Sequence, residues 1–178
     1  MRVISGKYKR LTIEAPKGMT SRPTTDKIKE TIFNILGPLE GVGLDLFAGS
    51  GGLGIEGISR GLEKVIFIDG SYQAIQTIKK NVSFIEEPVE IYKNDYKRAL
   101  KALHKRAIKF DMVFLDPPYQ KDIVNEVLPL LLEYELLNQD ARILVECEKQ
   151  EIIETHGYEV LKDETYGITK IIILRSAS

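Results

Sequence analysis

Short apolar runs alternate with amphipathic segments between residues 42 and 147. The apolar runs, each long enough for a buried strand, occupy residues 42–47, 64–69, 89–92, 110–115 and 141–147. The segments between them carry apolar residues at helical spacing and predict helices at residues 53–60, 71–83, 96–103 and 123–134. A repeated strand–helix order favours an α/β fold, in which a parallel sheet has helices on both faces.

The two ends of the chain break this order. Residues 158–165 and 168–174 are β-rich runs separated by Tyr166-Gly167, a turn signal that predicts a C-terminal antiparallel hairpin. With it we predict a mostly parallel, seven-stranded sheet. At the front, residues 3–5 and 11–14 flank a polar stretch, as the strands of a small N-terminal β-hairpin would. Next along the chain, either of two threonines can cap a helix that runs to residue 36; these are Thr24 and Thr25.

Composition limits the class of protein. The 178 residues are 43% hydrophobic and 29% charged, which is ordinary for one soluble globular domain. No apolar run approaches the ~20 residues that span a bilayer. The N-terminus lacks the apolar core of a signal peptide, so we expect a cytoplasmic protein without a membrane partner. Cys147 is the only cysteine, and His104 and His156 lie far apart, so we expect no internal disulfide and no metal site.

The charge is unevenly distributed along the chain. The net charge is −1, but residues 1–22 carry six basic residues against one acidic residue, a net charge of +5. We therefore divide the chain into a basic hairpin arm, residues 1–21, and a main domain, residues 22–178. The arm predicts an anionic partner, although a solvated charged face would have the same composition. A second basic stretch, from Arg98 to Lys109, is interpreted as the solvated face of a helix.

Asp116-Pro117-Pro118-Tyr119 directly follows the predicted strand at residues 110–115. Each proline fixes φ and lacks an N–H group, so the corner is stiff and presents carbonyls and a carboxylate without competing donors. Such acceptors suit the two hydrogens of an exocyclic amino group, and the Tyr119 ring offers a surface on which a base can stack. A buried strand that simply ends in a proline turn is the alternative.

The glycine loop carries a second signal. Gly49, Gly51 and Gly54 match the dinucleotide fingerprint G-x-G-x-x-G. Asp69 ends the next strand, where an acid binds ribose hydroxyls, so a nicotinamide enzyme must be considered. Asp45 argues against it, because a carboxylate there would repel a pyrophosphate but attract the ammonium group of S-adenosylmethionine. The alternative for Asp45 is that the loop's own N–H groups satisfy it.

Four aspartates lie at the same place relative to the predicted strands. Asp45, Asp69, Asp95 and Asp116 follow four successive predicted strands. Ligands of open α/β sheets bind outside the carboxyl ends of the strands. One acid can hold an ammonium group, one the ribose, one the adenine amino group and one the reacting centre. A single strand-end aspartate would be interpreted as a helix cap, but four in succession predict a cofactor site.

At these residues the chain resembles the class I S-adenosylmethionine-dependent methyltransferases. Residues 44–54 resemble that class's motif I, and residues 116–119 resemble the signature of enzymes that methylate amino nitrogens on planar groups. Residues 22–36, followed by residues 44–51, are similar to the RsmD family, which methylates guanine N2 in the small-subunit (16S) ribosomal RNA of bacteria. The resemblance runs essentially end to end and implies a Rossmann-like class I methyltransferase fold.

The resemblance also implies a set of site residues. Those that would bind S-adenosylmethionine are Thr24, Asp45, Phe47, Ala48, Gly49, Ser50, Gly51, Asp69, Asp95, Tyr96 and Asp116. Those that would carry the reaction are Asp116, Pro117, Pro118 and Tyr119. Those that would bind the substrate are Lys9, Arg10, Arg22 and Tyr119. The expected partner is ribosomal RNA, either naked or in an assembled or assembling small subunit, bound by a monomer.

Other functions share some of these features. A methyltransferase of adenine N6 shares Asp-Pro-Pro-Tyr, but such enzymes usually carry a target-recognition insert, and no stretch here is long enough. A protein-glutamine methyltransferase would have Asn in place of Asp116. A nicotinamide reductase stays open through the glycine loop alone. A non-catalytic binding module would keep the cofactor fold without the reaction.

Overall fold

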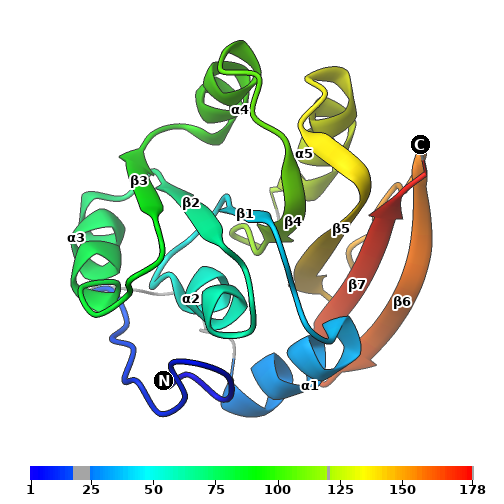
Figure 1. Cartoon of the computed structure of the whole chain (residues 1–178). Helices are drawn as coiled ribbons and strands as arrows, with labels where there is room; N and C mark the ends of the chain where they lie inside the picture. The colour runs from blue at the N-terminus through cyan, green and yellow to red at the C-terminus, as the bar shows by residue number, and fades with distance from the viewer. Residues whose placement is uncertain (18–24, 120, 178) are drawn as a thin grey trace.

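A seven-stranded sheet forms the centre of the protein (Figure 1), whose computed structural model describes residues 1–17, 25–119 and 121–177. The strands are β1 (Val42–Asp45), β2 (Lys64–Asp69), β3 (Val89–Lys93), β4 (Phe110–Leu115), β5 (Leu137–Glu148), β6 (Tyr158–Tyr166) and β7 (Thr169–Ser176). Their order across the sheet is β3-β2-β1-β4-β5-β7-β6. The first five strands pair in parallel, and β7 lies antiparallel between β5 and β6. The predicted mostly parallel sheet with a C-terminal antiparallel hairpin is confirmed.

Helices cover both faces of the sheet, as the sequence predicted (Figure 1). They are α1 (Asp26–Leu36), α2 (Gly52–Ser59), α3 (Tyr72–Asn81), α4 (Tyr96–Lys105) and α5 (Ile123–Glu133). Thr25 is the N-cap of α1, where its Oγ1 accepts a hydrogen bond from the Ile28 N–H; Thr24 lies outside the described residues. Among the described residues, no helix is long and apolar enough to cross a membrane.

Side chains that alternate in direction along the strands form two separate hydrophobic cores, one on each face of the sheet. Successive side chains of a strand point to opposite faces, so one strand contributes to both. In β5, Ile143 and Val145 pack with α4 and α5, whereas Leu144 packs on the other face with α1, α2 and α3. Both faces of the strands are buried, which is why these strands appear in the sequence as nearly unbroken apolar runs.

Several elements differ in length from the prediction. Strand β1 ends at Asp45, two residues early, because the chain turns there into the glycine loop. Strand β5 begins at Leu137 instead of residue 141, since its early part pairs with Phe110 before a register shift. The pairing partner, not the local pattern, determined that start.

The N-terminal β-hairpin forms only in part. Residues 3–5 and 11–14 fold back on each other, but outside the sheet the pairing is a single isolated bridge between Arg2 and Thr12. Backbone groups that full strands would have paired bond elsewhere. The Ile4 and Ser5 N–H groups, for example, donate to Glu56 of α2.

Glu56 anchors this N-terminal segment to the body of the protein. Its carboxylate is buried and accepts the Ile4 and Ser5 N–H groups at 2.9 and 3.2 Å. It also forms ion pairs with Arg60 at 2.8 Å and with the buried Lys29 at 3.5 Å. Burial lowers the pKa of Lys29, while the Glu56 carboxylate opposes that shift. One carboxylate therefore joins α1, α2 and the N-terminal segment.

We expect Glu56→Ala to destabilise the protein by about 3–5 kcal/mol, because it leaves a buried lysine and two backbone N–H groups without their carboxylate. Urea unfolding at neutral pH measures the change. The exposed Glu63→Ala is the control and should cost less than about 0.5 kcal/mol. An equal loss in both variants would contradict the anchoring role.

Candidate active site

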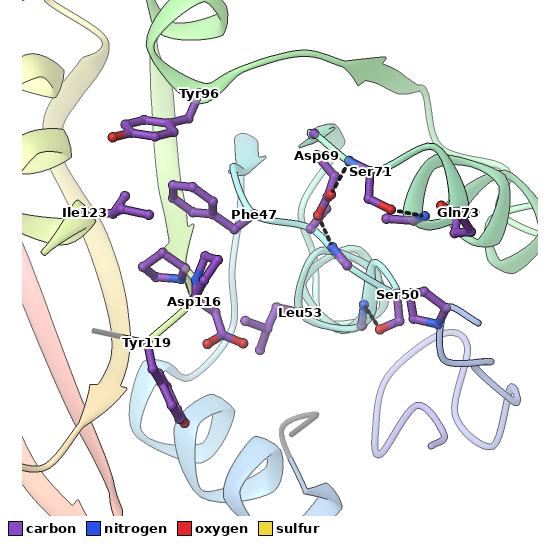
Figure 2. A pocket seen from close by; sticks show the side chains of 18 of the residues that line it. Phe47, Ser50, Leu53, Asp69, Ser71, Gln73, Tyr96, Asp116, Tyr119 and Ile123 are labelled. Carbon is purple, nitrogen blue, oxygen red and sulfur yellow. Dashed lines mark hydrogen bonds between the residues drawn. The ribbon is translucent and has the colours of Figure 1, made fainter. Parts of the chain in front are cut away.

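The candidate site lies where the direction of the sheet reverses. From β1 the chain builds outward through β2 to β3, and then returns to place β4 on the other side of β1. Crevices at such a switch point, outside the carboxyl ends of the strands, are the ligand sites of open α/β sheets. A cavity of about 890 Å³ lies there (Figure 2).

The cavity gathers most of the predicted site residues. Those that line it are Phe47, Ala48, Gly49, Ser50, Asp69, Tyr96, Asp116, Pro117, Pro118 and Tyr119. Residues that the sequence analysis did not name also line it, among them Met1, Lys17, Lys29, Leu53, Gln73, Lys121 and Ile123. The predicted residues Lys9 and Arg10 are exposed and do not line it. Arg22 and Thr24 lie outside the described residues.

The glycine loop fits closely against the sheet. Gly51 has a φ of 81°, in the left-handed region that favours glycine, and precedes the first turn of α2. Gly54 packs so tightly that a Cβ atom there would lie 2.4 Å from a ring carbon of Phe67. Two positions of the fingerprint are thus required by backbone geometry.

Asp45 lies under this loop rather than in the cavity lining. Its side chain is 1% exposed, and its Oδ2 accepts the Gly54 N–H at 3.0 Å. Burial raises the pKa of Asp45 from 3.8 to about 8, and the nearby Asp69 adds to the shift, while the hydrogen bond from Gly54 opposes it. The loop's own N–H group therefore bonds to Asp45, which is the alternative that the sequence left open.

Asp69 holds two loops and still faces the cavity. One carboxylate oxygen accepts the Gly49 N–H and the other accepts the Ser71 N–H, each at 2.9 Å (Figure 2). These bonds fix the glycine loop relative to the start of α3. They place a carboxylate at the carboxyl end of β2, where the sequence predicted one.

Asp95 has a structural task in this protein. It is the N-cap of α4, where its Oδ2 accepts the Lys97 and Arg98 N–H groups, and it does not line the cavity. The next residue, Tyr96, does line it, with its ring centroid 5.4 Å from that of Phe47. Burial and a hydrogen bond to Glu126 raise the pKa of Tyr96 to about 12. The two rings are inclined to each other by 52° and form an apolar wall.

Asp116 begins the corner that follows β4, and the sequence predicted that this residue carries the reaction. Asp116 lines the cavity, and the carboxyl group of Glu146, on the neighbouring strand β5, lies near it. Burial and the neighbouring carboxylates of Glu146 and Asp45 hold the pKa of Asp116 well above its usual range. Glu146 is 3% exposed. The sequence analysis missed it, although a lone acid inside the apolar run at residues 141–147 is the same signal that identified Asp45.

Tyr119 lies near the C-terminal hairpin. Thr169 of β7, which is buried, is close to its hydroxyl group. Burial raises the pKa of Tyr119. Figure 2 shows the ring below Asp116, at the end of the cavity opposite Asp69. The stacking surface therefore lies beside a strand of the C-terminal hairpin.

We expect the buried Asp45 to make stability depend on pH. Folding raises its pKa from 3.8 to about 8, so the native state keeps a proton that the unfolded chain releases. Wild type should therefore lose stability relative to Asp45→Asn as the pH rises through that window, by at most about 1.4 kcal/mol per pH unit. Urea unfolding across the pH range measures the difference. The exposed Asp163→Asn is the control, and its stability should change with pH in parallel with that of wild type. Parallel stability curves for wild type and Asp45→Asn would contradict the prediction.

Comparison with known proteins agrees with this geometry. The profile of the family described as "Conserved hypothetical protein 95" matches residues 1–175. The Bacillus subtilis protein named "Putative rRNA methyltransferase YlbH" is 48% identical over 98% of this chain and 98% of its own length. "Ribosomal RNA small subunit methyltransferase D" of Haemophilus influenzae is 34% identical over 94% of this chain and 90% of its own length.

A solved structure extends the likeness to three dimensions. The crystal structure titled "putative methylase HI0767" from Haemophilus influenzae is 30% identical and superposes with a TM-score of 0.78. The match covers 100% of this chain and 99% of that one. The α/β architecture is thus the Rossmann-like methyltransferase fold, and the chain belongs to the RsmD family of class I methyltransferases, as its sequence predicted.

Proposed function

We propose that this protein transfers a methyl group from S-adenosylmethionine to the N2 amino group of a guanine in small-subunit (16S) ribosomal RNA. One observation carries the proposal: the Asp116–Tyr119 corner forms a wall of the same cavity as the glycine loop and Asp69. A cofactor held at the loop and a base held at the corner would meet inside this cavity. Two of the relatives are named as ribosomal RNA methyltransferases, and these names support ribosomal RNA as the class of substrate.

The α2 N-terminus supports a cofactor without phosphates. A dinucleotide places its pyrophosphate on the free N–H groups at such a helix start. Here the Gly52 N–H donates to Ser50 Oγ at 3.1 Å, and the Gly54 N–H donates to the Asp45 carboxylate at 3.0 Å. These contacts favour S-adenosylmethionine over a nicotinamide cofactor.

The residues of the cavity fit the parts of S-adenosylmethionine. When bound, the cofactor supplies a methyl group already activated on a sulfonium. We propose that Asp69 binds the ribose hydroxyls and that the Phe47–Tyr96 wall, beside Asp95, binds the adenine. The glycine loop and Asp45 behind it would hold the methionine end. The loop residues in this role are Ala48, Gly49, Ser50 and Gly51.

The corner would orient the acceptor base. The Asp116 carboxyl group and the Pro117 carbonyl accept the two hydrogens of the guanine amino group, which directs the nitrogen lone pair toward the methyl group. Pro118 keeps the corner rigid. Tyr119 stacks on a guanine turned out of its RNA loop. Orientation and electrostatics of this kind supply several kcal/mol of transition-state stabilisation.

Basic side chains would bind the RNA backbone. We propose that the arm, residues 1–21, contacts phosphates through Lys9 and Arg10, with Arg22 directly after it. Two exposed lysines that line the cavity extend this surface beyond the residues the sequence pointed to; they are Lys17 and Lys121.

The function is tested by methyl transfer in vitro. The purified protein is incubated with labelled S-adenosylmethionine and with small subunits or naked ribosomal RNA from a strain that lacks the gene. Mass mapping then locates the modified nucleotide. Methylation at guanine N2 supports the proposal, whereas methylation only at adenine N6, or none on either RNA substrate, contradicts it.

Asp69→Ala should weaken S-adenosylmethionine binding by roughly 1–3 kcal/mol, because a ribose hydroxyl loses its acceptor. Isothermal titration calorimetry measures the change, and a titration with NAD is the control ligand. Tight binding of NAD with no binding of the methyl donor would overturn the cofactor assignment.

Asp116→Ala should act on turnover and leave cofactor binding unchanged. The carboxyl group strengthens its interaction as positive charge grows on nitrogen, so we expect kcat to fall about 100-fold or more. Tyr119→Ala should remove stacking worth ~1–3 kcal/mol. Tyr119→Phe keeps the ring, although it loses the Thr169 contact, and should retain most activity. Single-turnover kinetics measure each rate; wild-type rates in Asp116→Ala would make the corner a structural turn.

A further inference from the structure

The N-terminal arm borders the same cavity as the glycine loop. Within the described part of the arm, three residues line the cavity: Met1, Pro16 and Lys17. Val3 and Ile13 of the arm are buried in the hydrophobic core that they share with α2 and α3. The arm is therefore a wall of this cavity as well as a basic surface.

One buried side chain joins the arm to the glycine loop. Asn81, the last residue of α3, is 5% exposed. Its Nδ2 donates to the Glu14 carbonyl at 2.9 Å and to the Ser50 carbonyl at 2.8 Å, and its Oδ1 accepts the Glu14 N–H at 3.0 Å. Both hydrogens of the amide are thus used. The pair of bonds to Glu14 fixes the arm two residues before Pro16, where the chain reaches the cavity.

The bond from Asn81 also fixes the shape of the loop. The peptide group between Ser50 and Gly51 is bound at both ends, because its carbonyl accepts from Asn81 and its N–H donates to the Ala48 carbonyl at 2.7 Å. These two bonds maintain the left-handed turn at Gly51, beside the loop residues that line the cavity. A loop that is ordered before its ligand arrives loses less conformational entropy on binding.

We propose that Asn81 is a positioning residue for cofactor binding, which holds the glycine loop and the arm in one arrangement so that the arm completes the cavity around the methionine end of S-adenosylmethionine. The inference rests on the proposed function for the place of that end at the loop. It goes beyond that function because it gives the arm a task in cofactor binding as well as in RNA binding. Asn81 acts through Ser50 and Glu14, since it does not itself line the cavity.

Hydrogen exchange of the wild-type protein, measured by NMR, tests the inference without any substitution. Excess S-adenosylmethionine should slow exchange of the Gly49 N–H in the loop and of the Glu14 N–H in the arm by about 10-fold or more, because the bound ligand stabilises both segments. The control is the Glu154 N–H, which donates to Asn125 at 2.8 Å and lies outside the cavity lining. Its exchange should stay unchanged.

The possible results of the exchange experiment separate the two proposals. Slower exchange at Gly49 alone would overturn the role of the arm, and so would equal slowing at Gly49, Glu14 and Glu154. Unchanged exchange at all three would reject the assignment of the cofactor, and the inference with it.

Substitution of Asn81 should weaken the binding of S-adenosylmethionine about 10-fold or more, as measured by isothermal titration calorimetry without RNA. Asn81→Ala removes all three hydrogen bonds. Asn81→Asp keeps the shape and the acceptor for the Glu14 N–H, but an ionised carboxylate has no donor for the Ser50 carbonyl. Circular dichroism shows whether each variant is folded, and the exchange experiment on wild type decides the question for a variant that is not.

A matched control lies on α5. The Asn125 side chain also joins a helix to another segment by hydrogen bonds, to the Ile152 carbonyl and from the Glu154 N–H, each at 2.8 Å. Asn125→Ala should bind the cofactor like wild type. An equal loss of affinity in Asn125→Ala, or wild-type affinity in both Asn81 variants, would reject the role of Asn81.

Steady-state kinetics separate positioning of the cofactor from the reaction itself. Asn81→Asp should raise the KM for S-adenosylmethionine about 10-fold and leave kcat at saturating cofactor within about twofold of wild type. A fall in kcat with an unchanged KM would contradict the inference. A wild-type protein that binds the cofactor but methylates no guanine would reject the proposed substrate and leave the role of Asn81 in place.

Discussion

The site depends on one electrostatic constraint: several acids lie close together at the carboxyl ends of adjacent strands. Asp45 ends β1, Asp116 directly follows β4 and Glu146 lies in β5, and these three strands are consecutive in the sheet. A buried carboxyl group must be satisfied by a donor, a cation or a proton, because an isolated buried carboxylate is costly. The Gly54 N–H satisfies Asp45, and this bond requires α2 to start where it does, against Phe67. The position of the glycine loop therefore follows from the carboxyl group beneath it.

Much of the fold could be predicted because its signals are local. Strands buried on both faces give unbroken apolar runs, and the predicted bounds of β2 and β4 match the structure. The features that differ depend on partners distant in sequence. β5 starts early because it pairs with Phe110, and the N-terminal segment, whose hairpin pairing is a single bridge, is bound by Glu56 of α2. A pattern read along one segment does not contain the contact that another segment will make.

The same distinction applies to the site. The corner at Asp116 and the acid at Asp69 were predictable, because a strand end, a turn and a charged residue follow one another in the chain. Asp95 has the same local signal, yet it caps α4. The position of Glu146 near Asp116 was not predictable, since it depends on the register between β4 and β5. Sequence patterns thus indicate which residues reach the edge of the sheet, and only the register determines which of them lie close together.

The two sides of the switch point hold the two ends of the cavity independently. Asp69 and the glycine loop belong to the half of the sheet that contains β1 and β2, whereas the corner lies beside Glu146 of β5 and Thr169 of β7. The antiparallel β7 therefore does more than extend the sheet, because it also borders the ring of Tyr119. Contacts from β5 and β7 would tune the acceptor base, and contacts from β1 and β2 would tune the methyl donor. Such a division lets the substrate half of the site vary while the donor half stays the same.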